Sequence, residues 1–142
     1  MFQRLIQGGR ATLLVAALLA GCSETTDPPA DDPVIAQATI SGDDQTGVVS
    51  RALAQPIRVI VTQDGEPLAG STVTWAADGA GASVSPTTST TDAQGIAFTT
   101  WTLGSAVGAQ TARATLTGAT GSPIQFSATA TAAGPVQAVG RK

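Results

Sequence analysis

The chain has 142 residues, a formal net charge of −3, one cysteine and no histidine. Without histidine, the commonest general base and metal ligand of proteins is missing, and the few basic residues provide no patch for nucleic acid. A single cysteine excludes an intrachain disulfide framework, and the length suits one domain held together by apolar packing. We therefore expect a protein that is not an enzyme, has no cofactor and does not bind nucleic acid.

The first 21 residues have the layout of a secretory signal peptide. Arg4 and Arg10 come first, an apolar run covers 11–20, and the run ends at the small residues Ala20 and Gly21. As a helix, this run spans about 15 Å, half of the roughly 30 Å hydrocarbon core of a bilayer. It is too short for a stable transmembrane helix, and we predict that residues 1–21 are cleaved.

The cysteine directly after this run points to lipidation. The tetrapeptide Leu19-Ala20-Gly21-Cys22 resembles the lipobox of bacterial lipoprotein precursors. The resemblance implies cleavage between Gly21 and Cys22, a diacylglycerol on the Cys22 sulfur, and the membrane as partner through an N-terminal lipid anchor, which two or three acyl chains make durable. An ordinary secreted protein with an incidental cysteine is the alternative. Ser23 stands where enterobacterial lipoproteins of the inner membrane commonly have Asp, so the resemblance implies the outer membrane.

Residues 22–33 are predicted to be the lipidated cysteine and a flexible linker. The stretch SETTDPPADDP has prolines and acidic residues but no large apolar side chain, so it cannot bury a core. We expect it to hold a folded domain away from the membrane. The alternative is an acidic metal-binding segment, although nothing in the stretch would fix its carboxylates in one geometry.

From Val34 onward, short segments rich in Val, Ile and Thr alternate with Gly, Pro and Asp, which is typical of an all-β sandwich or barrel. The turn residues of 42–47 and the Asp64-Gly65 pair are expected to interrupt the strands. We predict seven or eight strands and no helix after the signal peptide. The predicted strands are 34–40, 56–62, 71–77, a short one within 78–86, a polar one within 87–95, 96–103, 111–117 and 123–132.

Alternation within the strands identifies candidate core residues. Val73 and Trp75 share one face, and Ile57, Val59 and Val61 share another. The predicted core is Trp75, Trp101, Phe98, Phe126, Ile57, Val59, Val73, Ile96, Leu116 and Ile124. One strand is inconsistent, because Ile96 and Phe98 have the opposite parity from Trp101 and Leu103. Either a bulge at Thr99-Thr100 resets the phase or the strand is covered on both faces at its far end, and we favour the bulge.

Four motifs carry a resemblance to the bacterial immunoglobulin-like domains of the invasin and intimin group. They are DGEPLAG at 64–70, VTW at 73–75, TDAQGIA at 91–97 and GAQ at 108–110, and the strand VIV at 59–61 matches as well. The resemblance covers about 34–133 and implies an immunoglobulin-like Greek-key β-sandwich, followed by a short tail over 134–142. The motif residues have structural explanations: Gly65, Gly70 and Gly95 suit positive φ or close approach, Pro67 fixes its own φ, and Asp64 and Asp92 bond to turn amides.

The resemblance implies a structural spacer or an adhesion and interaction module, with an envelope protein or a glycan as possible partner. A solute- or calcium-binding envelope lipoprotein is the alternative, because loop carboxylates can gather at one end of a sandwich; the candidates are Asp43, Asp44, Asp64, Asp78 and Asp92. Exposed tryptophans, Trp75 and Trp101, are a further alternative as a carbohydrate platform. Pro135-Val136 repeats Pro33-Val34 about one domain length later. The alternatives are a chance match and a chain that is one repeat of a longer array.

Overall fold

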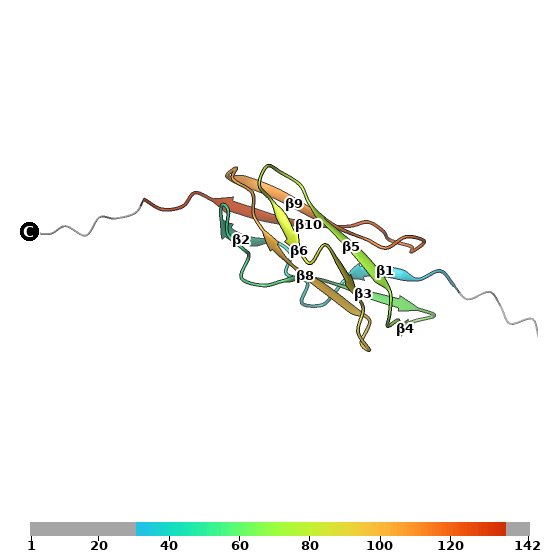
Figure 1. Cartoon of the computed structure of the whole chain (residues 1–142). Coiled ribbons are helices and arrows are strands. Elements are labelled where there is room, and N and C mark those ends of the chain that lie inside the picture. Colours follow the sequence, from blue (N-terminus) through green and yellow to red (C-terminus); the bar gives the residue numbers. More distant parts are fainter. Residues whose placement is uncertain (1–30, 136–142) are drawn as a thin grey trace, which may run out of the picture. The chain divides into compact units, whose positions relative to one another are not determined.

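Two five-stranded β-sheets make up the computed structural model, which describes residues 31–135 (Figure 1). The predicted signal peptide, the cleavage and lipidation sites at Gly21 and Cys22, and the tail beyond residue 135 lie outside the described residues. The strands are β1 (Val34–Gln37), β2 (Gln45–Val48), β3 (Ile57–Gln63), β4 (Glu66–Pro67), β5 (Thr72–Ala77), β6 (Ser83–Ser85), β7 (Thr88–Thr90), β8 (Ile96–Thr102), β9 (Gly108–Thr115) and β10 (Ile124–Thr131). The predicted all-β sandwich is confirmed.

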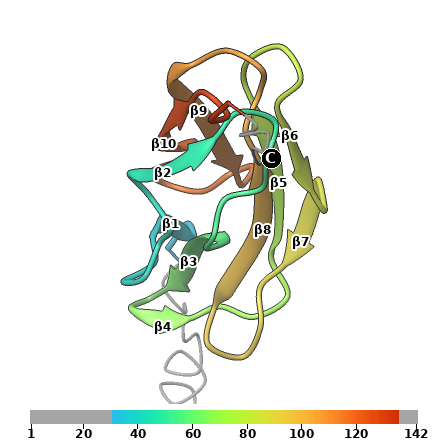
Figure 2. The same cartoon turned by 90° about the vertical axis from the view of Figure 1, so that its left-hand side faces the viewer.

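Sheet 1 has the order β1-β3-β8-β6, with the short β4 also paired to β3, and sheet 2 has the order β2-β10-β9-β5-β7. The pair β2–β10 is parallel, and the other strand pairs are antiparallel. Strands β1 and β2 therefore form the edges on one side of the sandwich and β6 and β7 those on the other (Figure 2). No helix in the described part of the chain is long and apolar enough to cross a membrane.

Two of the ten strands do not appear in the sequence prediction. The segment 42–47 was expected to be a turn, but its second half belongs to β2, which takes its hydrogen bonds from β10. The other strand, β4, follows the Asp64-Gly65 turn, whose φ angles of 54° and 85° suit a type I′ hairpin. Both strands lie among turn-forming residues, so only their partner strands make them recognisable.

The predicted linker contacts the sandwich before Val34. The amide of Gln63 donates to the backbone oxygen of Asp31 at 2.9 Å, and the backbone N–H of Thr120 donates to the oxygen of Pro33 at 2.8 Å. The last residues of the segment that was expected to remain unpacked are thus hydrogen-bonded to the domain.

Apolar side chains from both sheets fill the space between them. The aromatic pair at its centre is Trp75 and Phe126, whose ring centroids are 6.2 Å apart at an interplanar angle of 40°, a tilted contact that aromatic rings favour. The indole N–H of Trp75 donates to the Ser89 hydroxyl at 2.7 Å. Trp101 is fully buried and has no hydrogen-bond partner for its indole N–H among the described residues, so packing alone holds it. Both tryptophans are core residues, which excludes the carbohydrate platform.

Phe98 was predicted to lie in the core, and this prediction is wrong: its exposed fraction is 53%. Strand β8 alternates without interruption, with Ala97, Thr99 and Trp101 inside, so the bulge predicted at Thr99-Thr100 is also wrong. Trp101 sets the phase because the indole has more apolar surface to bury than the phenyl ring. Thr99 can occupy an inner position because its hydroxyl donates to the backbone oxygen of Pro86 at 2.6 Å. Ile96, on the same face as Phe98, is only half-buried.

We expect Phe126→Ala and Phe98→Ala to differ sharply in stability. Phe126 is 1% exposed, so its truncation should leave a cavity and lower the free energy of unfolding by about 3–5 kcal/mol. Phe98→Ala should change it by no more than about 0.5 kcal/mol, as is usual at surface positions. Urea denaturation of both variants measures this difference, and equal losses would contradict the observed phase of β8.

Candidate interaction surface

The outer face of sheet 1 carries a row of apolar side chains that nothing in the described chain covers. In the strand register, Ala36 of β1 lies opposite Ile60 of β3, and Ile60 lies opposite Ile96 of β8. Directly opposite residues of antiparallel strands have their side chains on one face, about 5 Å apart. Phe98 is two residues further along β8 on this face, and Val34, at the start of β1, is 42% exposed. We call Val34, Ala36, Ile60, Ile96 and Phe98 the sheet 1 patch.

The outer face of sheet 2 has a different composition. Its central strands β5, β9 and β10 present mostly hydroxyl side chains to the solvent, among them Thr74, Thr115 and Thr129. Threonine suits a strand and keeps a hydrated surface. The one exposed large apolar residue on the strands of this sheet is Val48, at the end of the edge strand β2. The two faces of the same sandwich therefore differ: apart from Val48, the exposed large apolar side chains on the strands lie on sheet 1, and Ile40 and Val107 are exposed in loops.

Charge distinguishes the sheet 1 face as well. Arg58 lies on β3 directly opposite Phe98, and its guanidinium forms no ion pair among the described residues, where the one pair joins Arg113 and Asp78. Strands β1, β3 and β8, which carry the patch, have no carboxylate, and the one carboxylate on the strands of sheet 1 is Glu66 of β4, opposite Gln63 at the end of β3. In a chain whose net charge is negative, this face combines exposed apolar area with a single positive charge. Aromatic residues and arginine are the residue types enriched in protein interfaces.

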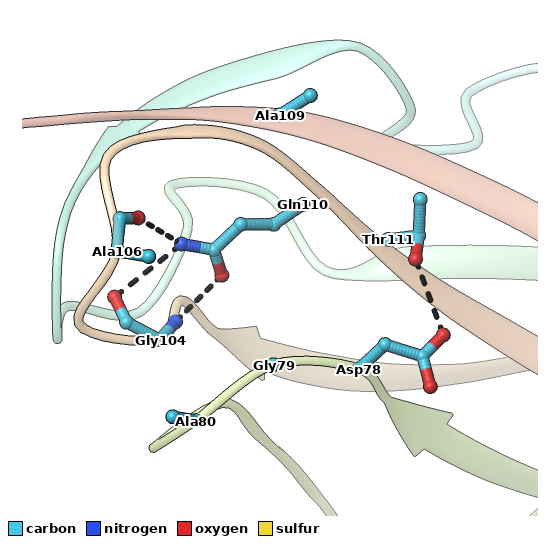
Figure 3. A pocket seen from close by; sticks show the side chains of 8 residues that line it. All are labelled: Asp78, Gly79, Ala80, Gly104, Ala106, Ala109, Gln110 and Thr111. Carbon is cyan, nitrogen blue, oxygen red and sulfur yellow. Dashed lines mark hydrogen bonds between the residues drawn. The ribbon is translucent and has the colours of Figure 1, made fainter.

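A hollow of about 240 Å³ lies at one end of the sandwich, between the loop after β5 and the loop before β9 (Figure 3). Gln110 is 8% exposed and ties this second loop together: its amide donates to the Ala106 oxygen at 2.6 Å, and its carbonyl accepts from the Gly104 N–H at 2.7 Å. The Arg113 guanidinium donates to Asp78, which lowers the pKa of this carboxyl, and Thr111 donates to it at 3.1 Å. The polar side chains that line the hollow thus already have hydrogen-bond partners in their own chain: Gln110 bonds to the loop backbone, and Thr111 bonds to Asp78.

The aspartates of the alternative calcium site accept hydrogen bonds from their own chain, and Asp43 and Asp44 share the Ser127 hydroxyl. Asp92 accepts the backbone N–H groups of Gln94 and Ile96, each at 2.9 Å, and so closes its own turn. Asp64 lies in the β3–β4 turn, and Asp78 pairs with Arg113. Within residues 31–135, the structure brings together no group of three acidic, histidine or cysteine side chains that would hold a metal ion.

The turn residues singled out in the sequence lie where the chain reverses. Gly65, Gly70 and Gly95 have φ angles of 85°, 84° and 73°. A Cβ atom on Gly95 would come within 2.4 Å of the Val61 backbone oxygen and 3.3 Å of the Pro67 Cα, so Gly95 is required for close approach as well as for its backbone angle. These residues position strands and contribute no chemistry of their own.

Asp43 is the most extensively bonded carboxylate of the described chain, a role the sequence did not reveal. Its side chain accepts from the Ser127 N–H at 2.7 Å, the Ser127 hydroxyl at 3.1 Å, the Asp44 N–H at 2.9 Å and the Gln37 amide at 2.9 Å. Burial opposes ionisation, but these donors outweigh it and hold the pKa of Asp43 below its usual value of 3.8. Asp43 thereby fastens the connection between β1 and β2 to β10.

The acid stability of the protein should depend on Asp43. Because the folded pKa is the lower one, the carboxylate stabilises the fold fully above the unfolded pKa and loses this contribution as the pH falls through the folded pKa. We expect Asp43→Asn to lower the free energy of unfolding near pH 7, and its difference from the unsubstituted protein to shrink below about pH 4. Urea denaturation across this range measures the difference, and a constant difference would contradict the role of the charge.

The sequence matches no protein-family model and no curated protein. Its fold is similar to solved structures of bacterial surface proteins. The D00-D0 domain of intimin is 16% identical with a TM-score of 0.56, over 75% of this chain and 51% of that chain. The adhesin InvE of Yersinia pseudotuberculosis is 16% identical with a TM-score of 0.50, over 72% of this chain and 32% of that chain. This chain thus spans about half of the first and a third of the second. The likeness confirms the predicted fold, an immunoglobulin-like β-sandwich.

Proposed function

We propose that the protein is a lipid-anchored component of the cell envelope, most suited to the outer membrane, whose immunoglobulin-like domain binds another protein and catalyses no reaction. The observation that carries this proposal is the contrast between the two outer faces: sheet 1 exposes Phe98 to 53% beside Ile60 and Ile96, whereas sheet 2 is covered by threonines. Contiguous exposed apolar surface is characteristic of interaction sites. The fold shared with intimin and InvE supports the same function.

The path of the chain suits a domain held at its N-terminal end. The described chain enters the sandwich at β1 and leaves it after β10 at the opposite end (Figure 1). An anchor before residue 31 would hold the entry end and leave the faces of both sheets accessible from the side. The sheet 1 patch would then be available to a partner approaching along the membrane or from a facing surface.

The chemistry of the sheet 1 patch favours a protein partner with apolar side chains and a carboxylate. Phe98 and the two isoleucines would be covered by apolar groups, and Arg58 would pair with the acidic one. A glycan would require several polar groups that converge on one sugar, and the patch has apolar side chains in these positions. A calcium or solute site, the alternative function, lacks a cluster of ligands among the described residues.

Lipidation is tested by labelling cells with a palmitate analogue. The protein should incorporate the label, and Cys22→Ala should not, because its sulfur is the proposed acceptor. The variant should also accumulate with its first 21 residues attached, which intact mass measurement detects. Equal labelling of both proteins would contradict the lipid anchor.

The interaction surface is tested with a photo-crosslinking amino acid on intact cells. Placed at Thr100, on the outer face of β8, it should yield a crosslinked protein, whereas the same probe at Thr74, on the outer face of sheet 2, should not. Adding Phe98→Glu should abolish the crosslink, and Thr74→Glu, which introduces the same charge on the other face, should leave it unchanged.

Three outcomes would contradict a protein partner at the sheet 1 patch. One is a crosslink from both probe positions, and another is a crosslink that survives Phe98→Glu. The third is a crosslinked product that glycosidase digestion removes, which would identify a glycan. A calcium-dependent rise in melting temperature that Asp64→Ala and Asp92→Ala eliminate would instead favour the ion-binding alternative.

A further inference from the structure

We propose that β7, the open edge of sheet 2, pairs with β7 of a second copy of this chain held on a facing membrane. The site is separate from the sheet 1 patch, because β7 lies at the edge of the other sheet. The pairing itself depends only on the described sandwich. The facing orientation rests on the proposed anchor before residue 31.

The edge strands β1 and β2, on the opposite side of the sandwich, are covered by their own chain. The Ile35 N–H of β1 donates outward to the Thr120 oxygen at 3.0 Å. Beside β2, the side chain of Gln45 bonds to the backbone N–H and the backbone oxygen of Gln55 at 2.9 and 2.8 Å. A further strand would have to displace these contacts to pair with either edge.

Strand β7 differs, because its outward backbone groups have no partner within residues 31–135. Positions that are hydrogen-bonded to the neighbour alternate with positions that are not along an antiparallel pair. The Trp75 N–H donates to the Thr87 oxygen at 2.8 Å, so the odd-numbered residues of this segment bond to β5. The N–H and C=O groups of Thr88 and Thr90 consequently point away from the sheet.

Side-chain hydrogen bonds hold this edge in place. The Ser89 hydroxyl accepts the indole N–H of Trp75 at 2.7 Å. At the end of β7, the Thr91 hydroxyl donates to the Leu68 oxygen at 2.7 Å and accepts from the Ser71 N–H at 2.9 Å. A strand that is fixed before binding loses little conformational freedom when a partner pairs with it.

The edge also lacks the features that keep strands apart. Natural sheets protect exposed edges with charged side chains, prolines or bulges. Residues 79–91 contain no charged side chain, and the register of β7 with β5 is continuous. Pro86 precedes β7 and limits the length over which a partner can pair. The free edge is therefore short but open to another strand.

The sequence of this edge indicates a second copy as its occupant. Residues 87–91 read TTSTT, which is the same in both directions about Ser89. In an antiparallel pair of two such edges, Thr88 lies opposite Thr90 of the second copy, and Thr90 opposite its Thr88. Each edge offers the N–H and C=O groups of these two residues, so every donor finds an acceptor. The facing threonines are also favourable cross-strand pairs, and a two-fold axis at Ser89 makes the edge complementary to itself.

The antiparallel arrangement suits the side chains as well as the backbone. A parallel pair of identical edges would turn one sheet over, so the threonines of the two copies would lie on opposite faces. In the antiparallel pair, the exposed threonines of both β7 strands lie on one face. Asp92 then lies opposite Pro86 of the second copy, so the carboxylates nearest to the edge do not face each other.

Antiparallel pairing places the two anchors at opposite ends. The strands run along the length of the domain, and the described chain enters and leaves it at opposite ends (Figure 1). Two copies paired at β7 therefore point in opposite directions, and anchors before residue 31 lie in facing membranes. One pair is a small interface, but many pairs between two surfaces act together.

Disulfide trapping tests the antiparallel register in solution. Thr88→Cys and Thr90→Cys are made separately in the mature chain of residues 22–142 that also carries Cys22→Ser. Facing positions have Cα atoms about 5.5 Å apart, within reach of a disulfide, whereas equal positions are more than about 7 Å apart. Under mild oxidation, the mixture should form a covalent dimer in much higher yield than either variant alone. Equal yields, or no dimer from the mixture, would overturn the pairing.

Vesicle clustering tests the facing orientation without cellular lipidation. The thiol of Cys22, the single cysteine of the chain, is coupled to a maleimide lipid in phosphatidylcholine vesicles, and light scattering measures their clustering. The unsubstituted mature chain should cluster the vesicles. Thr88→Lys/Thr90→Lys and Thr88→Glu/Thr90→Glu should each abolish clustering, because like charges then face each other. Mixing vesicles of the two variants should restore it, because each lysine then faces a glutamate.

Thr115→Lys/Thr129→Lys is the matched control, because it adds the same charge to the outer face of sheet 2 on strands away from the edge. It should cluster vesicles as the unsubstituted chain does. All variants should keep the urea midpoint of the unsubstituted chain, since the substituted threonines are exposed. Clustering by the lysine edge variant alone, or none by the mixture, would overturn the pairing. A disulfide dimer without vesicle clustering would overturn the facing orientation.

The two measurements are independent of the tests of the proposed function. They involve neither cellular lipidation nor another protein, so they can fail while the lipid-labelling and sheet 1 crosslinking tests succeed, and the reverse. Thr74 lies about 10 Å from the nearest strand of the second copy, so a probe at this position remains a control for the sheet 1 patch.

Discussion

The uninterrupted alternation of β8 between core and surface connects the stability of the sandwich to the chemistry of its outer face. A strand has only two faces, so placing Trp101 inside determines where every other side chain of β8 lies. With one cysteine in the whole chain, packing between the sheets must supply the cohesion that disulfides give many small secreted domains. Trp101 and Ala97 serve this packing, and Phe98 is directed to the solvent as a consequence. The exposed position of Phe98 in the sheet 1 patch is thus a by-product of core formation.

The polar residues of the loops are used mainly for architecture. Asp92 closes its own turn. Asp43 connects the segment between β1 and β2 to β10, and Gln110 holds the loop before β9 in place. Carboxylates and amides that are saturated by donors of their own chain have little capacity left to bind an ion or a small solute. Exposed side chains without partners in the described part of the chain lie instead on the outer face of sheet 1, with Phe98 as the largest of them.

The segment that leads from β1 in sheet 1 to β2 in sheet 2 is hydrogen-bonded to the last strand, β10. Strand β1 belongs to sheet 1 and β2 to sheet 2, so the first residues of the domain fasten both sheets together. The same arrangement places the entry of the chain and its exit at opposite ends of parallel strands (Figure 1).

The sequence by itself determined the class of fold and the positions of the reversals, because these depend on local properties. Gly65 and Gly95 mark turns through the backbone angles that only glycine adopts easily, and β-branched residues mark the strands. Local properties also placed Trp75 and Phe126 in the core, since each strand alternates simply.

Only the tertiary structure decided the rest. Strand β2 exists because β10 supplies its hydrogen bonds. Phe98 points outward because Trp101 and Thr99 of the same strand find their contacts in the interior. Asp43 has its structural role because it accepts hydrogen bonds from Ser127, a residue 84 positions away in the chain. Such choices depend on which segments meet, and distance along the sequence carries no information about that.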